Sequence, residues 1–200
     1  RLDRVTAAWS ADDVVGPVSL DLAPGRRIGV AGPSGSGKST LAAVLVRFLA
    51  PTSGRHLVGG VPVARLRADD VRRVTGLLDD DPYLFASTLG ENVRLARPEA
   101  TNADVEAALR QASLGEWLDS LPDGLATRVG DGGSAVSGGE RARIGVARLL
   151  LADHPVLVLD EPTAHLDTAT AEAVADELLS LPSRSVVWIT HGTVGLDRMD

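Results

Sequence analysis

The chain of 200 residues carries 27 acidic and 20 basic side chains, which gives a net charge of −7, and it contains no cysteine. The absence of cysteine excludes a disulfide scaffold and a thiolate metal site. The acidic balance argues against nucleic acid as the main partner, because phosphate backbones are bound by basic surfaces. The best candidate for a membrane span, residues 41–50, is too short to cross a bilayer and is interrupted by Arg47.

The predicted elements begin with two segments, 2–9 and 14–22, whose alternation of apolar and polar residues indicates antiparallel strands. Apolar residues at helical spacing predict a helix over 38–50, ended by Pro51, and another over 168–181. Continuous apolar runs predict four buried strands, at 26–32, 71–79, 155–160 and 185–190. Between them, the stretch 82–151 has a helical pattern with breaks at Pro98, Gly115, Pro122 and 130–139.

Buried strands that alternate with helices predict an α/β fold, in which helices cover both faces of a parallel sheet. We expect a single domain over 1–200. Its core, with an N-terminal antiparallel β subdomain, is expected to comprise 1–81 and 152–200. Residues 82–151 are expected to form an inserted helical lobe.

A glycine-rich loop, GPSGSGKST, joins the strand predicted at 26–32 to the following helix and holds Lys38, the only lysine of the chain. Its spacing, G-x-x-x-x-G-K-S, is that of a phosphate-binding P-loop. Gly35 and Gly37 let backbone N–H groups turn toward a phosphate, Lys38 supplies a compact charge that arginine could not replace, and Ser39 offers a hydroxyl to Mg²⁺. We therefore predict nucleotide binding by Gly32, Pro33, Ser34, Gly35, Ser36, Gly37, Lys38, Ser39 and Thr40.

The strand predicted at 155–160 ends in two carboxylates, Asp160 and Glu161. At the carboxyl end of such a strand, Asp160 is placed to hold Mg²⁺ through water and Glu161 to polarise an attacking water. Two adjacent acids after a strand would otherwise be read as a solvated loop. The run VLVLD is too apolar for a surface strand, which favours the functional interpretation.

A third motif, VSGGERARIGVARLLL over 136–151, predicts a helix that starts with a capping box between Ser137 and Glu140. A well-capped helix would explain these two residues alone. It would not explain Gly138 and Gly139, because two glycines in a first turn cost helix stability. They are expected to leave N–H groups open to an anion.

Together these motifs resemble the ATP-binding cassette of an ABC transporter over essentially the whole chain. GPSGSGKST resembles Walker A, VSGGERAR the family signature, and VLVLDEP Walker B with a catalytic glutamate. AHLD at 164–167 resembles the D-loop and contributes Asp167, and His191 resembles the switch histidine. Trp9 lies where the family carries an aromatic that stacks on adenine, although a tryptophan in an early strand could also be a core residue.

The resemblance implies a P-loop NTPase fold, ATP and Mg²⁺ as ligands, and hydrolysis by Glu161, His191 and Lys38. It also implies a second cassette, in a homo- or heterodimer packed head to tail, so that Ser137, Gly138, Gly139 and Glu140 reach the nucleotide of the partner. The chain would serve the transmembrane domain of an exporter at the cytoplasmic face of a bacterial inner membrane. The isolated domain is expected to be soluble.

One position departs from the family pattern. LLDDDPYLFASTLGENV at 77–93 resembles an exporter segment in which a glutamine touches Mg²⁺, and Asp80 stands at that place. A carboxylate can bind Mg²⁺ as well, but when ionised it cannot donate a hydrogen bond. TRVGDGG at 127–133 resembles a segment of exporters that contacts the transmembrane domain, which favours export over import.

The stretches SGGERARIGVAR, EPTAHLD and ITHGTVGLDRMD resemble the exporter of cytochrome bd assembly, and most closely its CydC-type subunit, which implies glutathione or cysteine as cargo. Three alternatives remain: an exporter of lipid, peptide or drug, a P-loop switch without transport, and a cassette that binds ATP without hydrolysing it. His56, His154 and His165 match no motif and are interpreted as surface or core residues.

Overall fold

The computed structural model describes residues 1–10, 14–131, 133, 135–164 and 166–200. The chain forms two compact units. We call the first the core unit; it comprises Arg1–Leu77, His154–Glu161 and Pro182–Asp200. The second, the helical unit, comprises Leu78–Asp153 and Pro162–Leu181. It includes the predicted lobe 82–151, while the predicted domain boundaries themselves stay a prediction.

An antiparallel sheet opens the core unit, in the order β2-β1-β4-β5. Strands β1 (Leu2–Ala8) and β2 (Val14–Leu20) pair antiparallel, as the alternation of their sequences predicts. β4 (Ser53–Val58) pairs with the other edge of β1, and β5 (Val61–Pro62) extends the sheet. β4 was not predicted, because its sequence SGRHLV is too polar to give a strand signal.

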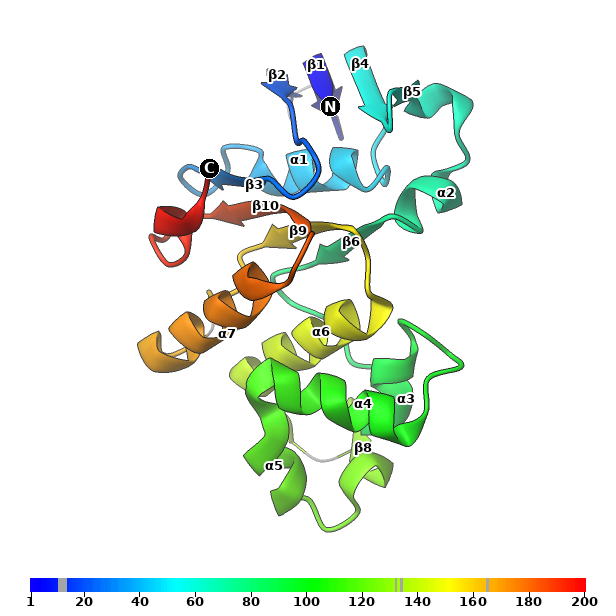
Figure 1. Cartoon of the computed structure of the whole chain (residues 1–200), viewed down its shortest axis with the longest axis vertical. Helices are drawn as coiled ribbons and strands as arrows, with labels where there is room; N and C mark the ends of the chain where they lie inside the picture. The colour runs from blue at the N-terminus through cyan, green and yellow to red at the C-terminus, as the bar shows by residue number, and fades with distance from the viewer. Residues whose placement is uncertain (11–13, 132, 134, 165) are drawn as a thin grey trace. The chain divides into compact units, whose positions relative to one another are not determined.

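The second sheet of the core unit has the order β3-β10-β9-β6 (Figure 1). β10 (Ser185–Thr190) lies between β3 (Arg27–Ala31) and β9 (Val156–Asp160) and pairs parallel with both. Its six residues are all buried, as predicted. β3 was also predicted to be buried, which is wrong: it is half-exposed, because it forms an edge of the sheet.

The strand predicted over 71–79 is shorter than expected. Helix α2 (Ala68–Arg72) occupies its first two residues, and β6 begins only at Thr75 and ends at Leu78. Asp69 and Asp70 lie in the first turn of α2, where carboxylates are favoured by the helix dipole. The described part of the core unit also contains two short 3-10 turns, Val63–Arg65 and Leu196–Arg198.

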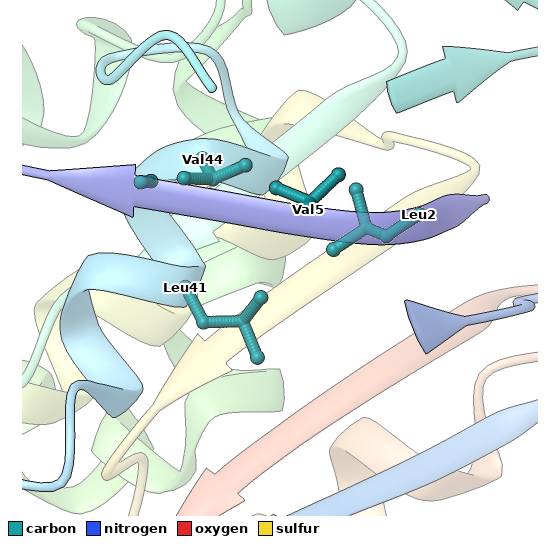
Figure 2. Packing of buried hydrophobic residues seen from close by; sticks show 5 residues of the cluster. Leu2, Val5, Leu41 and Val44 are labelled. Carbon is teal, nitrogen blue, oxygen red and sulfur yellow. The ribbon is translucent and has the colours of Figure 1, made fainter. Parts of the chain in front are cut away.

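Helix α1 (Lys38–Leu45) packs against both sheets of the core unit. Figure 2 shows Leu41 and Val44 of α1 beside Leu2 and Val5 of β1. Ala42 of α1 and Val46, the residue after its last turn, pack against the other sheet. Their contacts there are Val158 of β9 and Val187 and Ile189 of β10. The helix ends at Leu45 rather than at the predicted residue 50, because the backbone turns left-handed at Arg47, with φ of 59°.

The helical unit contains five α-helices among its described residues: α3 (Leu89–Arg94), α4 (Asn102–Leu109), α5 (Gly115–Ser120), α6 (Gly138–Ala152) and α7 (Thr168–Ser180). A π-helical turn over Arg110–Leu114 joins α4 to α5, and a 3-10 turn covers Gly124–Ala126. Gly115 was predicted to break a helix, but it begins α5, and the kink lies at Ser113, where φ is 58°.

Two very short strands of the helical unit, β7 (Ser87–Thr88) and β8 (Arg128–Val129), pair antiparallel and were not predicted. Each has only two residues, too few for an alternating pattern to be recognised. Across the described ranges, no helix combines the length and the apolar character that a membrane crossing requires.

Candidate nucleotide-binding site

The glycine-rich loop lies between β3 and α1 in the core unit. Gly35 and Gly37 both have left-handed backbones, with φ of 77° and 86°, which glycine adopts at little cost. At Gly37 the space is also closed, because a Cβ atom built there would lie 2.1 Å from Cγ2 of Val15 in β2. The loop conformation therefore depends on glycine at these positions.

The first turn of α1 presents backbone donors. The first intrahelical hydrogen bond runs from the N–H of Leu41 to the carbonyl of Gly37, at 2.9 Å. The N–H groups of residues 38–40 precede that bond and have no acceptor within the helix. They carry the positive end of the helix dipole, which favours an anion such as phosphate.

Lys38 folds back over its own loop. Its Nζ donates to the carbonyl oxygens of Gly32, at 2.9 Å, and Pro33, at 3.0 Å. It also lies 3.9 Å from Oε1 of Glu161, and only 10% of the side chain is exposed. The ammonium group is thus held at the loop by two carbonyl dipoles and one carboxylate.

Glu161 follows β9, where the backbone turns left-handed with φ of 51°. Its N–H donates to the carbonyl of Ile189 in β10, at 2.9 Å. Its side chain is 13% exposed, and Oε1 lies 2.8 Å from Nδ1 of His191. Oε2 lies 3.3 Å from Oγ1 of Thr190. Because β3, β10 and β9 are parallel neighbours, their carboxyl ends bring Lys38, Glu161 and His191 to one edge of the sheet.

Two oxygen donors in the core unit fit a magnesium ion. Ser39 is in the first turn of α1, and Asp160 ends β9 as a buried carboxylate. Mg²⁺ keeps several waters and binds through one or two protein oxygens together with substrate phosphates. Within the described residues no group of three or more acidic, histidine or cysteine side chains is placed to hold a metal ion.

An open pocket of about 710 Å³ lies beside the loop, between β2 and β3. Its lining includes Gly32, Pro33, Ser36, Gly37 and Lys38, and its volume is in the range of small-molecule sites. Trp9 follows β1 and is 57% exposed, so the alternative that it is a core residue is wrong. Its stacking on adenine stays a prediction.

The signature segment begins α6 in the helical unit, and its capping box is confirmed. The N–H of Ser137 donates to Oε2 of Glu140, at 2.8 Å, and the N–H of Glu140 donates to Oγ of Ser137, at 3.2 Å. Gly138 borders open space, since a Cβ atom built there would meet nothing within 4 Å. The helix start is therefore bare at Gly138.

Asp167 also begins a helix of the helical unit. It caps α7 by accepting hydrogen bonds from Oγ1 of Thr170, at 2.6 Å, and from the N–H of the same residue, at 3.1 Å. These bonds hold the pKa of the Asp167 carboxyl below its usual value. Its D-loop role stays a prediction. His165, in the same motif, and Gly132, in TRVGDGG, lie outside the described residues.

The three adjacent aspartates of the helical unit differ in their surroundings. Asp81 forms an ion pair with Arg141 of α6, at 3.3 Å. Asp80 is exposed, and its N–H donates to Oδ1 of Asp79, at 3.0 Å. The pairing of Asp81 with Arg141 removes part of the repulsion expected from three like charges.

The sequence analysis did not predict two residues that contact the site, Val15 and Thr190. Val15 lies against Gly37, and Thr190 lies between Glu161 and Gly192. Both are β-branched residues within strands, so their sequence signal is that of ordinary strand residues. Of the histidines without a motif, His56 is buried, and His154 lies near the surface with Nδ1 at 3.1 Å from the carbonyl of Arg73.

Known proteins resemble this chain in sequence and in fold. The family described as "ABC transporter" matches residues 15–164. A mycobactin import ATP-binding/permease protein, IrtB, of Mycolicibacterium thermoresistibile is 43% identical over 201 residues, which cover 100% of this chain and 35% of that protein. The glutathione/L-cysteine transport protein CydD of Bacillus subtilis is 38% identical over 192 residues, which cover 96% of this chain and 33% of that protein.

A solved structure of a bacterial Atm1-family ABC exporter with ATP bound matches with a TM-score of 0.91 and 34% identity, over 98% of this chain and 35% of that one. This match confirms the predicted fold class. The chain spans about a third of the length of these relatives. A CydD protein is among them, but closeness to the CydC-type subunit stays a prediction. The chain belongs to the ABC transporter family and is an ATPase domain of its exporter type.

Proposed function

We propose that this chain binds ATP together with Mg²⁺, hydrolyses it, and thereby drives an ABC transporter of the exporter type. The observation that carries the proposal is the cluster at the edge of the parallel sheet. There Lys38, beside the phosphate-binding loop, lies 3.9 Å from Glu161, and Glu161 lies 2.8 Å from His191.

In this proposal the loop recognises the phosphates. The first-turn N–H groups of α1 and the ammonium of Lys38 bind the β- and γ-phosphates, for which Lys38 must release the carbonyls of Gly32 and Pro33. Ser39 and Asp160 would hold Mg²⁺, which supplies positive charge against the phosphate oxygens.

Glu161 acts as the general base. Its carboxylate accepts a proton from water while the water oxygen bonds to the γ-phosphorus and the bond from that phosphorus to the ADP oxygen breaks. His191, which is 63% exposed, orients the carboxylate in the structure and can turn to the γ-phosphate. The buried strands β9 and β10 keep both residues at the same edge.

The signature segment is proposed to act on a second cassette. Ser137, Gly138 and Gly139 give α6 an open N-terminus, which suits a phosphate held by another copy or by a related chain packed head to tail. The relatives are named ATP-binding/permease proteins, which supports a transmembrane domain as further partner and a place at the cytoplasmic face of the membrane.

For the cargo, we propose a small thiol such as glutathione or cysteine, because the motifs resemble the CydC-type subunit and CydD is 38% identical. A siderophore is the second candidate, because the mycobactin import protein is 43% identical. In the whole transporter, faster ATP hydrolysis with reduced glutathione and not with an iron siderophore would support the first. The opposite response would support the second.

The variant Glu161→Gln tests hydrolysis. We expect Mg-ATP turnover to fall by about 100-fold or more, because the general base is lost, while ATP still binds. Phosphate release is measured over a range of protein concentrations. If two cassettes must pair to hydrolyse ATP, the rate rises more steeply than the protein concentration. Glu116→Gln, at an exposed position of α5, is the matched control and should leave turnover unchanged.

Two results would contradict the proposal. Normal turnover in Glu161→Gln would remove Glu161 from the mechanism. Tight ATP binding by the unaltered chain without any turnover, at every protein concentration, would favour a nucleotide switch or a cassette that does not hydrolyse ATP.

A further inference from the structure

Thr190, the last residue of β10, connects the proposed base Glu161 to the loop that follows the strand. Its hydroxyl Oγ1 lies 3.3 Å from Oε2 of Glu161 and accepts a hydrogen bond from the N–H of Gly192, at 2.9 Å. The residue is 4% exposed, so its side chain is closed off from solvent.

The direction of these hydrogen bonds follows from the chemistry of a hydroxyl. Thr190 has one proton to donate. Because the N–H of Gly192 is already the donor toward Oγ1, the hydroxyl proton is directed at Oε2 of Glu161. At 3.3 Å this hydrogen bond is long for a hydroxyl donor, so its contribution is to direct the carboxylate and not to bind it strongly.

Two further partners of the carboxylate among the described residues are of a different kind. Lys38 and His191 both lie toward Oε1, at 3.9 and 2.8 Å. Under the proposed function both turn to the phosphates when ATP binds. Thr190 cannot follow, because it is buried in β10, whose backbone is paired on both sides with β3 and β9 (Figure 1).

We infer that Thr190 is a positioning residue for hydrolysis: it holds Oε2 of Glu161 in place after nucleotide has drawn Lys38 and His191 away, so that Oε1 faces the attacking water. The inference rests on the proposed function. It adds a group that acts through Glu161 and does not touch the nucleotide.

The backbone hydrogen bond of Glu161 does not fix its carboxylate, so a second hydrogen bond is needed. Its left-handed conformation, with φ of 51°, is fixed by the bond from its N–H to the carbonyl of Ile189, at 2.9 Å. That bond fixes the Cα atom and leaves the side-chain torsions free. A hydrogen bond to the carboxylate itself is needed to fix the position of the reacting oxygen.

The test compares Thr190→Val, which keeps the shape and removes the hydroxyl, with Thr190→Ser, which keeps the hydroxyl. We expect kcat for Mg-ATP to fall about tenfold in the valine variant, with KM and ATP affinity within about twofold of the unaltered chain, and to recover in the serine variant. Thr75→Val is the matched control, because Thr75 is a buried threonine of β6 in the same sheet, and its kcat should not change.

A second measurement does not depend on hydrolysis. The ring ¹⁵N signals of His191, without nucleotide, report its contact with Glu161 and should shift in Thr190→Val and not in Thr190→Ser. An unchanged kcat and unchanged His191 signals in the valine variant would overturn the inference, as would a serine variant as slow as the valine variant. A chain that never hydrolyses ATP contradicts the proposed function instead, and the His191 signals then decide on Thr190.

Discussion

The surroundings of Lys38 explain why the single lysine of this chain lies in the glycine-rich loop. Its Nζ fits between two carbonyl oxygens of the loop and Oε1 of Glu161, while only 10% of the side chain is exposed. The planar fork of arginine needs a wider space and fixed bonding directions. The position therefore selects lysine by shape as well as by charge.

Asp80 gives a prediction about metal dependence. Replacing it with glutamine removes an exposed carboxylate that can attract Mg²⁺, so we expect the Mg²⁺ concentration for half-maximal hydrolysis to rise roughly threefold. Asp123→Asn, in an exposed turn, serves as the control. Identical metal titrations of Asp80→Gln and the unaltered chain would show that Asp80 takes no part in metal binding.

Among individual residues, the sequence predicts the members of the site that belong to motifs with a fixed spacing. Lys38, Glu161 and His191 were each expected at the end or start of a strand or helix, and the parallel order of β3, β10 and β9 brings them together. Thr190 was not predicted, because a threonine at the end of an apolar strand is an ordinary strand residue. The exposure of Trp9 also depends on tertiary packing.

The element that combines packing with the candidate site is α6. Beyond its capped start, Gly145 allows the helix to approach Leu78 and Pro82 closely. A Cβ atom built on Gly145 would lie 2.5 Å from Cγ of Pro82 and 2.8 Å from Cδ1 of Leu78. The leucine could move, but the proline ring is stiff, so this contact requires glycine.

We therefore expect Gly145→Ala to lower the free energy of unfolding by roughly 1–3 kcal/mol, because the added methyl group overpacks the contact with Pro82. Urea titration followed by circular dichroism measures the change. Gly138→Ala in the same helix is the matched control for helix propensity, since its Cβ would meet nothing within 4 Å. Equal or greater stability of Gly145→Ala would show that the helix and the segment at Pro82 separate easily.

Elements with strong patterns were predicted, and those with weak patterns were not. β9, β10 and α7 agree closely with their apolar runs and periodicity. α1 ends early because Arg47 turns left-handed, and nothing in LVRFLA signals this. β4 is polar in sequence and exists because β1 offers it a free edge, which is a tertiary effect.

For the whole molecule, His56 sets a limit on stability at acid pH. It is buried in β4, and burial, together with the positive charges of the N-terminal amino group and Arg47, lowers its pKa from 6.5 to about 4. An unfolded chain binds a proton at His56 below about pH 6.5, whereas the folded chain does so only near pH 4. The stability from a neutral His56 is complete above pH 6.5 and is lost as the pH falls toward 4.

We expect this group to account for about 2 kcal/mol of the loss in unfolding free energy between pH 6.5 and 4. His56→Leu removes the titrating group, so the difference in stability between the two chains should depend on pH in this range. His154→Leu, at a histidine near the surface, is the control. A difference that stays constant from pH 7 to 4 would show that the protonated ring is tolerated in the fold.

The division of the chain into two units also divides the predicted site residues. The core unit holds the phosphate loop, Asp160, Glu161 and His191, and the helical unit holds the signature segment and Asp167. The sequence predicts a helical insertion from its change of pattern after β6, but it does not predict that α7 belongs to the helical unit, because α7 is separated in sequence from the other helices.

Calorimetric titration of Mg-ATP into the chain and into Lys38→Ala tests the central claim most directly. We predict saturable binding by the unaltered chain and by the control Arg65→Ala, at an exposed arginine, and a loss of affinity of about 100-fold or more in Lys38→Ala, because the phosphate charge loses its buried partner. Equal ATP affinity in Lys38→Ala and the unaltered chain would contradict the account.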